Sequence, residues 1–249
     1  MGGASALLDR RHRVVLAALA AGLAVYYAVS TSLWNASLWW DVAFLALVLM
    51  PAVFGLVWAV LPLVRARGLL ALAGALVVLA VVLTAAHNGA VADFAKLAAA
   101  TMLAFALLVF VDDLALVVLV AAIIPFVDAW SVWRGPTHVI VTHRRSIFNT
   151  LSFAFPVPGE HASANLGLPD LFFFAFFLAA CAHFGLRVGW AWAAMVAGLG
   201  ATMAIAVWLD LGGLPALPAI ALGFVLPNVD LLWRRLWVER PRGSPSEPK

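Results

Sequence analysis

Residues 114–133 read LALVVLVAAIIPFVDAWSVW, and residues 167–184 read GLPDLFFFAFFLAACAHF. Each stretch is about as long as a helix that crosses a membrane, and each contains one acidic residue, Asp128 in the first and Asp170 in the second. A carboxylate in a lipid-embedded helix costs roughly 2.5–3.5 kcal/mol on insertion scales, and such groups usually face the interior of a bundle or a wet cavity. We therefore expect both acids to have a function.

The rest of the chain has the same apolar character. Of its 249 residues, 65% are hydrophobic and only 11% are charged, which excludes an ordinary soluble domain. Apolar runs of about 20 residues recur along most of the length, so we predict an all-α, polytopic bundle of transmembrane helices. The eight expected spans are residues 13–33, 42–64, 69–86, 92–111, 114–133, 167–184, 188–209 and 214–233.

The arginines predict an orientation. With eight spans, four arginine groups fall on one side of the membrane, and the positive-inside rule makes that side cytoplasmic. The four groups are Arg10, Arg11 and Arg13; Arg65 and Arg67; Arg187; and Arg234 and Arg235. The long loop between the two acid-bearing spans, residues 134–165, then lies outside. Because the net charge of +3 is scattered over span ends and forms no basic groove, we expect membrane lipid around the chain and no nucleic-acid partner.

Three parts are expected along the chain. Residues 1–113 form a four-helix scaffold, residues 114–238 carry both acids, and residues 239–249, which end in PRGSPSEPK, form a disordered tail. Residues 137–142 of the loop read THVIVT, a strand-like run that either pairs with an unwound substrate or is a plain surface loop. The abundance of alanine and of arginine over lysine hints at a prokaryotic cell membrane as the location.

The two acids are placed where they can meet. Asp128 lies near the end of its span and Asp170 near the start of the next, so both are expected roughly 5–8 Å below the same membrane face. Two close carboxylates share one proton and can act as an acid and a base on the same substrate. A plainer interpretation of Asp170 is a first-turn acid after Pro169. Asp128 follows more than ten apolar residues and is harder to explain in this way, although a buried structural partner is the alternative for it.

Other polar residues within the apolar runs are expected to have structural roles. Helical spacing predicts ion pairs between Asp93 and Lys96 and between Asp230 and Arg234. His138 and His143 have no third ligand at a familiar spacing, so no metal site is expected.

These acids lie in short motifs that resemble those of the presenilin and signal peptide peptidase family, the GxGD-type intramembrane aspartyl proteases. The motifs are Val127-Asp128, Gly167-Leu168-Pro169-Asp170 and Pro215-Ala216-Leu217, in the order and on the membrane side that the family has. Phe155-Pro156-Val157-Pro158-Gly159 and the run after Asp128 are similar to archaeal members. The likeness covers about residues 114–233.

The resemblance implies a presenilin-like bundle that hydrolyses peptide bonds in single-span membrane proteins or signal-peptide-like segments. It implies that Asp128 and Asp170 are catalytic without a metal or a cofactor. It also implies that Gly167, Leu168, Pro169, Pro215, Ala216 and Leu217 bind substrate. Two residues depart from the family pattern, because Val127 replaces a tyrosine and Pro169 replaces a glycine. Either change is expected to narrow substrate choice or to abolish activity.

Three other functions are compatible with two acids at a membrane face. A non-catalytic relative would bind membrane helices without cutting them. A proton-coupled transporter would use the acids to carry a proton or cation, although no inverted repeat relates residues 13–111 to residues 114–233. A prepilin-peptidase-like enzyme also uses membrane-face aspartates, but this chain lacks the clustered cysteines that some of those enzymes carry.

Overall fold

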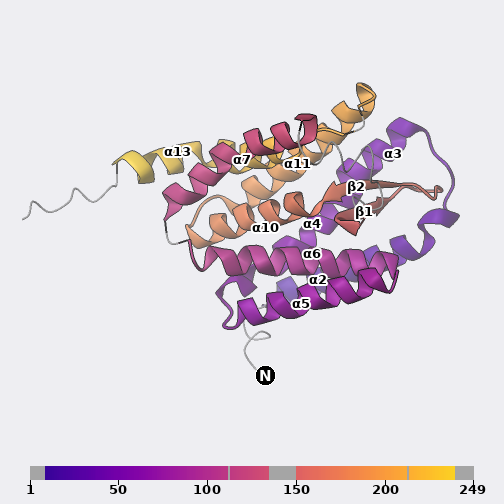
Figure 1. Ribbon diagram of the computed structural model, residues 1–249, viewed down its shortest axis with the longest axis horizontal. Coiled ribbons are helices and arrows are strands. Elements are labelled where there is room, and N and C mark those ends of the chain that lie inside the picture. The colour runs from indigo at the N-terminus through magenta and orange to yellow at the C-terminus, as the bar shows by residue number, and fades with distance from the viewer. Residues whose placement is uncertain (1–8, 112, 135–149, 212, 239–249) are drawn as a thin grey trace, which may run out of the picture.

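The computed structural model describes residues 9–111, 113–134, 150–211 and 213–238. These residues are mostly helical (Figure 1). The strand-like run 137–142, both loop histidines and the tail 239–249 lie outside the described residues. The described N-terminal elements are α2 (Arg10–Val29), η1 (Ser30–Ser32), α3 (Leu38–Phe44), η2 (Leu45–Leu49), α4 (Met50–Ala59), η3 (Leu61–Arg65), α5 (Leu69–Ala85) and α6 (Gly89–Leu108).

The C-terminal elements combine helices with one small sheet. They are α7 (Leu114–Arg134), β1 (Ser152–Pro156), β2 (Ser163–Gly167), α10 (Leu168–His183), α11 (Val188–Trp208), α12 (Leu217–Val225), η4 (Leu226–Asn228), α13 (Val229–Trp233) and η5 (Arg234–Val238). The segment from α3 to η3 runs as one interrupted helix, as does the segment from α12 to η5. All eight segments expected to be helical are therefore helical.

Six of these helices are long and apolar enough to cross a membrane. They are Arg10–Ser32, Leu38–Arg65, Gly89–Leu108, Leu114–Val132, Val188–Trp208 and Leu217–Trp237. The remaining two, α5 and α10, have 17 and 16 residues. At 1.5 Å per residue both are about 25 Å long, a little less than the ~30 Å hydrocarbon core of a bilayer. The outer helices expose large apolar side chains, as Val81 of α5 (62% exposed) and Phe126 of α7 (78%) show.

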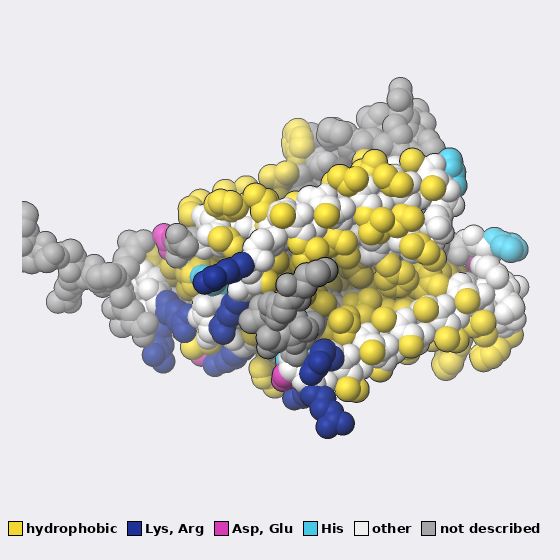
Figure 2. Space-filling model, turned by 90° about the horizontal axis from the view of Figure 1, so that it is seen from below, with side chains coloured by type: hydrophobic (Ala, Val, Ile, Leu, Met, Phe, Trp, Pro, Cys, Tyr) yellow, Lys and Arg dark blue, Asp and Glu magenta, His cyan; other side chains and the backbone are white. Residues whose placement is uncertain are grey.

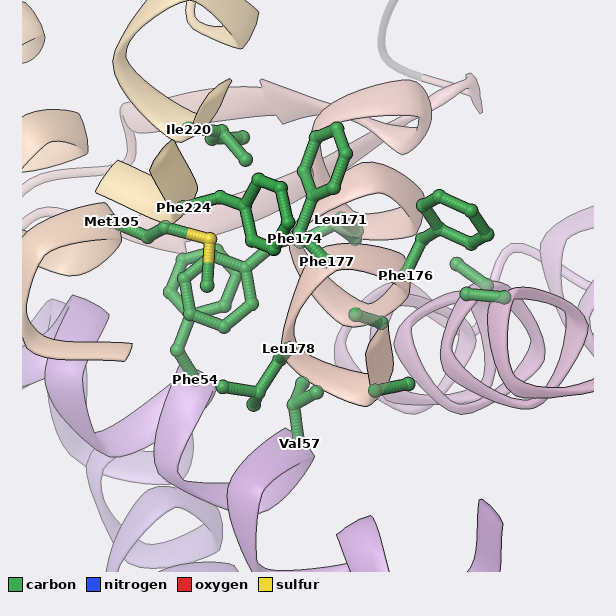
Figure 3. Close-up of a cluster of buried hydrophobic side chains, with 14 of the residues drawn as sticks. Phe54, Val57, Leu171, Phe174, Phe176, Phe177, Leu178, Met195, Ile220 and Phe224 are labelled. Atoms are coloured by element: carbon green, nitrogen blue, oxygen red, sulfur yellow. The ribbon is translucent and has the colours of Figure 1, made fainter. Parts of the chain in front are cut away.

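Helix α10 lies at the centre of the core because it is apolar on every side. Phe174 and Phe177 of α10 are fully buried between Phe54 of α4 and Phe224 of α12 (Figure 3). The ring centroids of Phe54 and Phe174 are 4.0 Å apart, and those of Phe177 and Phe224 are 4.9 Å apart. The acid at the start of α10 is therefore attached to a helix that is buried along most of its length.

The loop expected over residues 134–165 is not all loop. Strands β1 and β2 form an antiparallel hairpin in which Phe153 faces Leu166 and Phe155 faces Ala164. Phe153 and Phe155 are buried, while Ala154 between them faces the other way, the period-2 alternation typical of a strand. Gly159 in the connecting turn has φ of 73°, and an added Cβ would lie 2.3 Å from Asn35 Oδ1, so only glycine fits there.

We predict that Gly223→Ala destabilises the protein by about 1–3 kcal/mol through overpacking. Helices α11 and α12 approach so closely at Gly223 that an added Cβ would lie 2.6 Å from the Met195 backbone. The matched control is Gly74→Ala on α5, where an added Cβ meets nothing within 4 Å. Unfolding in detergent measures both variants; an equal effect of the two would contradict the close approach of α11 and α12.

Candidate active site

Asp128 is held by the start of another helix. It lies near the end of α7, is half-buried, and its Oδ2 accepts a hydrogen bond of 3.0 Å from the Leu217 amide. The first amides of a helix have no partner within the helix, and Pro218, the next residue of α12, has no N–H at all. Asp128 thus caps α12 across the bundle, where the helix dipole favours an anion.

Asp170 lies in the first turn of α10, immediately after the hairpin. Its Oδ2 accepts a hydrogen bond of 3.2 Å from the Gly167 amide, at the point where β2 ends. A Cβ added at Gly167 would lie 3.1 Å from the same oxygen, so a larger residue would crowd the carboxylate. Pro169 takes the second position of the helix, where an amide would have no intrahelical partner. The local sequence therefore fixes the direction of the Asp170 side chain.

The structure brings the two acids to the same end of the molecule. Helix α12 packs against both α7 and α10, which also contact each other. The Asp128 carboxylate lies within Coulombic range of Asp170 and repels a charge on it. The three motifs singled out in the sequence, around residues 128, 170 and 216, thus converge. Gly167, Leu168 and Pro169 lie on the Asp170 side of this site, and Pro215, Ala216 and Leu217 lie on the Asp128 side.

A cavity of about 150 Å³ adjoins the site. Phe155 and Asn165 of the hairpin line one side, and Met203 of α11 lines another. Ala216, which precedes the Leu217 amide that binds Asp128, lines it as well. The cavity therefore connects the hairpin with the segment that holds the first acid.

Side chains from α2 and α6 cover the outer edge of β1. The Lys96 Nζ donates to the Ser152 carbonyl at 2.5 Å, and the Tyr26 hydroxyl donates to the Pro156 carbonyl at 2.6 Å. Both backbone groups of Ala154 are also bound: its carbonyl accepts from the Tyr27 hydroxyl at 2.8 Å, and its amide donates to Asp93 at 3.4 Å. The backbone groups of Ser152, Ala154 and Pro156 therefore point toward the helices. The hydrogen bonds between β1 and β2 are made by the residues between them, Phe153 and Phe155. The hairpin is thus fixed to the helices through β1.

The outer edge of β2 is different. Asn165 pairs with Ala154 and Ser163 with Pro156, so their backbone groups point away from β1. In the part of the chain that the structure describes, these outward groups of Ser163 and Asn165 have no hydrogen-bond partner. One free strand edge therefore leads directly to Asp170.

One of the two expected ion pairs is confirmed and the other is wrong. Lys96 Nζ lies 2.5 Å from Asp93 Oδ1, and both side chains are buried. Asp230 pairs with Arg187, which donates to both carboxylate oxygens at 2.9 and 2.7 Å. The sequence spacing favoured Arg234 because it is one helical turn away, whereas Arg187 comes from the α10–α11 connection.

The sequence interpretation missed the residues that hold the hairpin. Tyr26 and Tyr27 are the only two tyrosines of the chain and lie side by side in the first apolar run, a signal that was not used. Asp93 and Lys96 were expected to bind each other, but not to bind β1.

Among the described residues, no group of three His, Cys, Asp or Glu side chains lies close enough to hold a metal ion. Comparisons of the chain with protein-family models, with curated proteins and with solved structures find no match.

Proposed function

We propose that this chain is an aspartyl endopeptidase that cuts peptide bonds within membrane helices, with Asp128 and Asp170 as its catalytic pair. The observation that carries the proposal is the 3.0 Å bond from the Leu217 amide to Asp128, beside Asp170. It joins motifs from three separate helices at one half-buried place. This convergence favours a presenilin-like enzyme over separate structural roles for the two acids.

The hydrogen bonds indicate which aspartate acts as the base and which as the acid. The Leu217 amide donates to Asp128 at 3.0 Å and the Gly167 amide donates to Asp170 at 3.2 Å. We assign the negative charge to Asp128, which has the shorter bond, and the shared proton to Asp170. Asp128 then removes a proton from water, whose oxygen bonds to the scissile carbonyl carbon, while Asp170 protonates the carbonyl oxygen. As the C–N bond breaks, the proton on Asp128 passes to the leaving nitrogen, and one diol hydroxyl returns a proton to Asp170.

The two departures from the family pattern are compatible with this chemistry. The side chain of Val127 is 54% exposed on the outside of α7, so a tyrosine hydroxyl in its place would also point out of the bundle. Pro169 occupies a first-turn position that tolerates proline, and the Gly167 amide still reaches Asp170. Neither change removes a group that binds the acids.

Eight membrane crossings form part of the proposal, and the arginines support it. Arg187 binds Asp230, Arg235 donates to the Phe184 carbonyl, and Arg11 lies 6.0 Å from the ring centroid of Trp58. These contacts gather the arginine groups at one end of the molecule (Figure 2). The start of α5 and the ends of α6 and α10 line one cavity at that end, so α5 and α10 each run between the two ends of the molecule, as crossing helices do. We propose a multi-pass protein of the cell membrane with this end in the cytoplasm.

The free edge of β2 suggests how a substrate is held. A helical substrate shields its peptide bonds, so it must unwind before water can attack. An unwound segment has free backbone groups and can pair with Ser163 and Asn165 by strand addition. The adjoining cavity, about 150 Å³, then lies where a substrate side chain would enter.

We predict that Asn165→Pro raises KM for cleavage roughly 3–10-fold, the effect of one lost hydrogen bond. Proline removes an outward N–H but leaves the β1–β2 bonds in place, since those come from Ala164 and Leu166. Ala164→Pro is the contrasting variant, which breaks the hairpin itself and lowers the unfolding temperature. An unchanged KM for Asn165→Pro would remove the free edge of β2 from substrate binding.

The direct test of the function is a search for products. Purified protein in liposomes is incubated with a labelled single-span substrate, and mass spectrometry locates the cut. The proposal requires two fragments that end inside the apolar stretch, with a new carboxylate and a new amine. Co-purification of uncut substrate with the wild-type protein would indicate a binding protein instead.

A further inference from the structure

A second cavity lies at the arginine end of the molecule, far from the two acids along the helices. Its volume is about 550 Å³, within the range of ligand pockets. It forms where the turn between η3 and α5 meets the C-terminal end of α6 and the end of α10. None of its lining residues belongs to the candidate active site.

The cavity has apolar walls and a basic rim. The walls come mainly from Leu69 and Leu70 at the start of α5 and from Leu108 and Phe110 at the end of α6. At the rim are Arg65 and Arg67 together with His183. Both arginines are exposed, and among the described residues neither has an ion pair or a hydrogen-bonded partner. Two unpaired guanidinium groups thus stand at the opening of an apolar pocket.

We propose that this cavity binds an anionic phospholipid of the cytoplasmic leaflet, with its phosphate on Arg65 and Arg67 and an acyl chain along the wall. Guanidinium groups match phosphate oxygens because they donate two parallel hydrogen bonds. A soluble anion would use the arginines but not the apolar walls, whereas an uncharged lipid would use only the walls. A phospholipid with a net negative charge matches both.

The position of the cavity at the membrane surface is consistent with a bound phospholipid. Arg65 ends one candidate span, Leu38–Arg65, and Leu69 begins the next apolar helix, so the rim lies at the membrane surface in the proposed orientation. Figure 2 shows the basic side chains gathered at this end and apolar side chains over the rest of the visible face. The cytoplasmic leaflet carries the anionic lipids that such juxtamembrane arginines attract. The inference uses the proposed membrane placement but does not depend on catalysis.

The test measures thermal unfolding of the purified full chain in detergent, titrated with phosphatidylglycerol or phosphatidylcholine. We expect phosphatidylglycerol to raise the unfolding temperature more than phosphatidylcholine does. In Arg65→Gln/Arg67→Gln, the apparent affinity for phosphatidylglycerol should fall roughly 25-fold. The matched control is Arg10→Gln/Arg13→Gln, which removes two charges from the same end but not from the cavity, and should retain the affinity.

Two further measurements distinguish lipid binding in the cavity from a general attraction between lipid and the charged surface. Leu70→Trp keeps both arginines but adds bulk to the apolar wall, so it should also weaken phosphatidylglycerol binding. Glycerol phosphate, the headgroup anion without acyl chains, should not raise the unfolding temperature at the same concentration. The proposal is overturned if the control pair loses as much affinity as Arg65→Gln/Arg67→Gln, if glycerol phosphate protects as well as the lipid, or if the two lipids act alike.

Discussion

Asp128→Asn is expected to lower the rate of substrate cleavage by about 10²–10⁴-fold, the usual contribution of a general acid or base. The asparagine amide cannot take a proton from water. Its oxygen can still accept the hydrogen bond from the Leu217 amide, 3.0 Å away in the native protein, so the cap on α12 is kept. We therefore expect a folded protein with little activity, measured as initial cleavage rates in liposomes beside unfolding curves in detergent.

Two companion variants separate chemistry from folding. Asp128→Ala removes the acceptor as well as the charge and should lose about 1 kcal/mol of stability in addition to its activity, as helix-cap losses do. Asp210→Asn is the neutral control, because Asp210 is exposed in the turn after α11 with φ of 51°, a conformation that asparagine also adopts. If Asp128→Asn cleaves substrate as fast as Asp210→Asn, then Asp128 is a helix cap and not a catalytic residue.

Lys96→Met is expected to reduce the free energy of unfolding by about 3–5 kcal/mol, as the loss of one partner from a buried ion pair does. It leaves the buried Asp93 carboxylate without its cation and removes the hydrogen bond from Lys96 to the Ser152 carbonyl. Strand β1 then loses one of its attachments to α6, and we expect β2, which leads into Asp170, to shift with it. Cleavage should fall even at temperatures where the variant is folded. Chemical unfolding and cleavage rates measure the two effects separately.

The double variant Asp93→Asn/Lys96→Met tests the cause. It removes both charges, so it should recover part of the stability lost by Lys96→Met alone. Thr101→Val on the same helix provides the comparison, since Thr101 is also buried but bonds only to the Leu97 carbonyl of its own helix, and it should lose only about 1 kcal/mol. A double variant less stable than Lys96→Met would show that Asp93 and Lys96 act on β1 independently of each other.

The helices were predictable because membrane-length apolar runs are a local property of the sequence. The unusual acids were found for the same reason, since Asp128 and Asp170 stand alone in such runs. Contacts between distant segments were not predictable in this way. The bond between Asp128 and Leu217 joins residues 89 positions apart, and Tyr26 reaches Pro156 across 130 positions. The resemblance placed the first of these contacts near the site. The adjacent tyrosines marked residues 26 and 27 as unusual, but nothing in the sequence indicated that their partners lie in β1.

The β1–β2 hairpin was also not predicted from the local sequence. From Phe153 to Pro156, buried positions alternate with half-buried ones, but the run is brief and contains Pro156, which weakens a strand prediction. Proline is accepted there because the outward position of residue 156 needs no amide donor toward β2, and the Tyr26 hydroxyl binds its carbonyl. The wrong partner chosen for Asp230 has a similar origin, since helical spacing describes neighbours on one helix and cannot foresee Arg187 from another connection.

The central claim is that the acids at positions 128 and 170 act as one unit, and a comparison of cleavage rates among Asp128→Asn, Asp170→Asn and the double variant tests it most directly. Residues that act together lose the same activity whether one or both are replaced. The proposed mechanism predicts an equal, near-complete loss in all three proteins, with each still folded. Substantial cleavage by either single variant, or a double loss equal to the product of the two single losses, would contradict it.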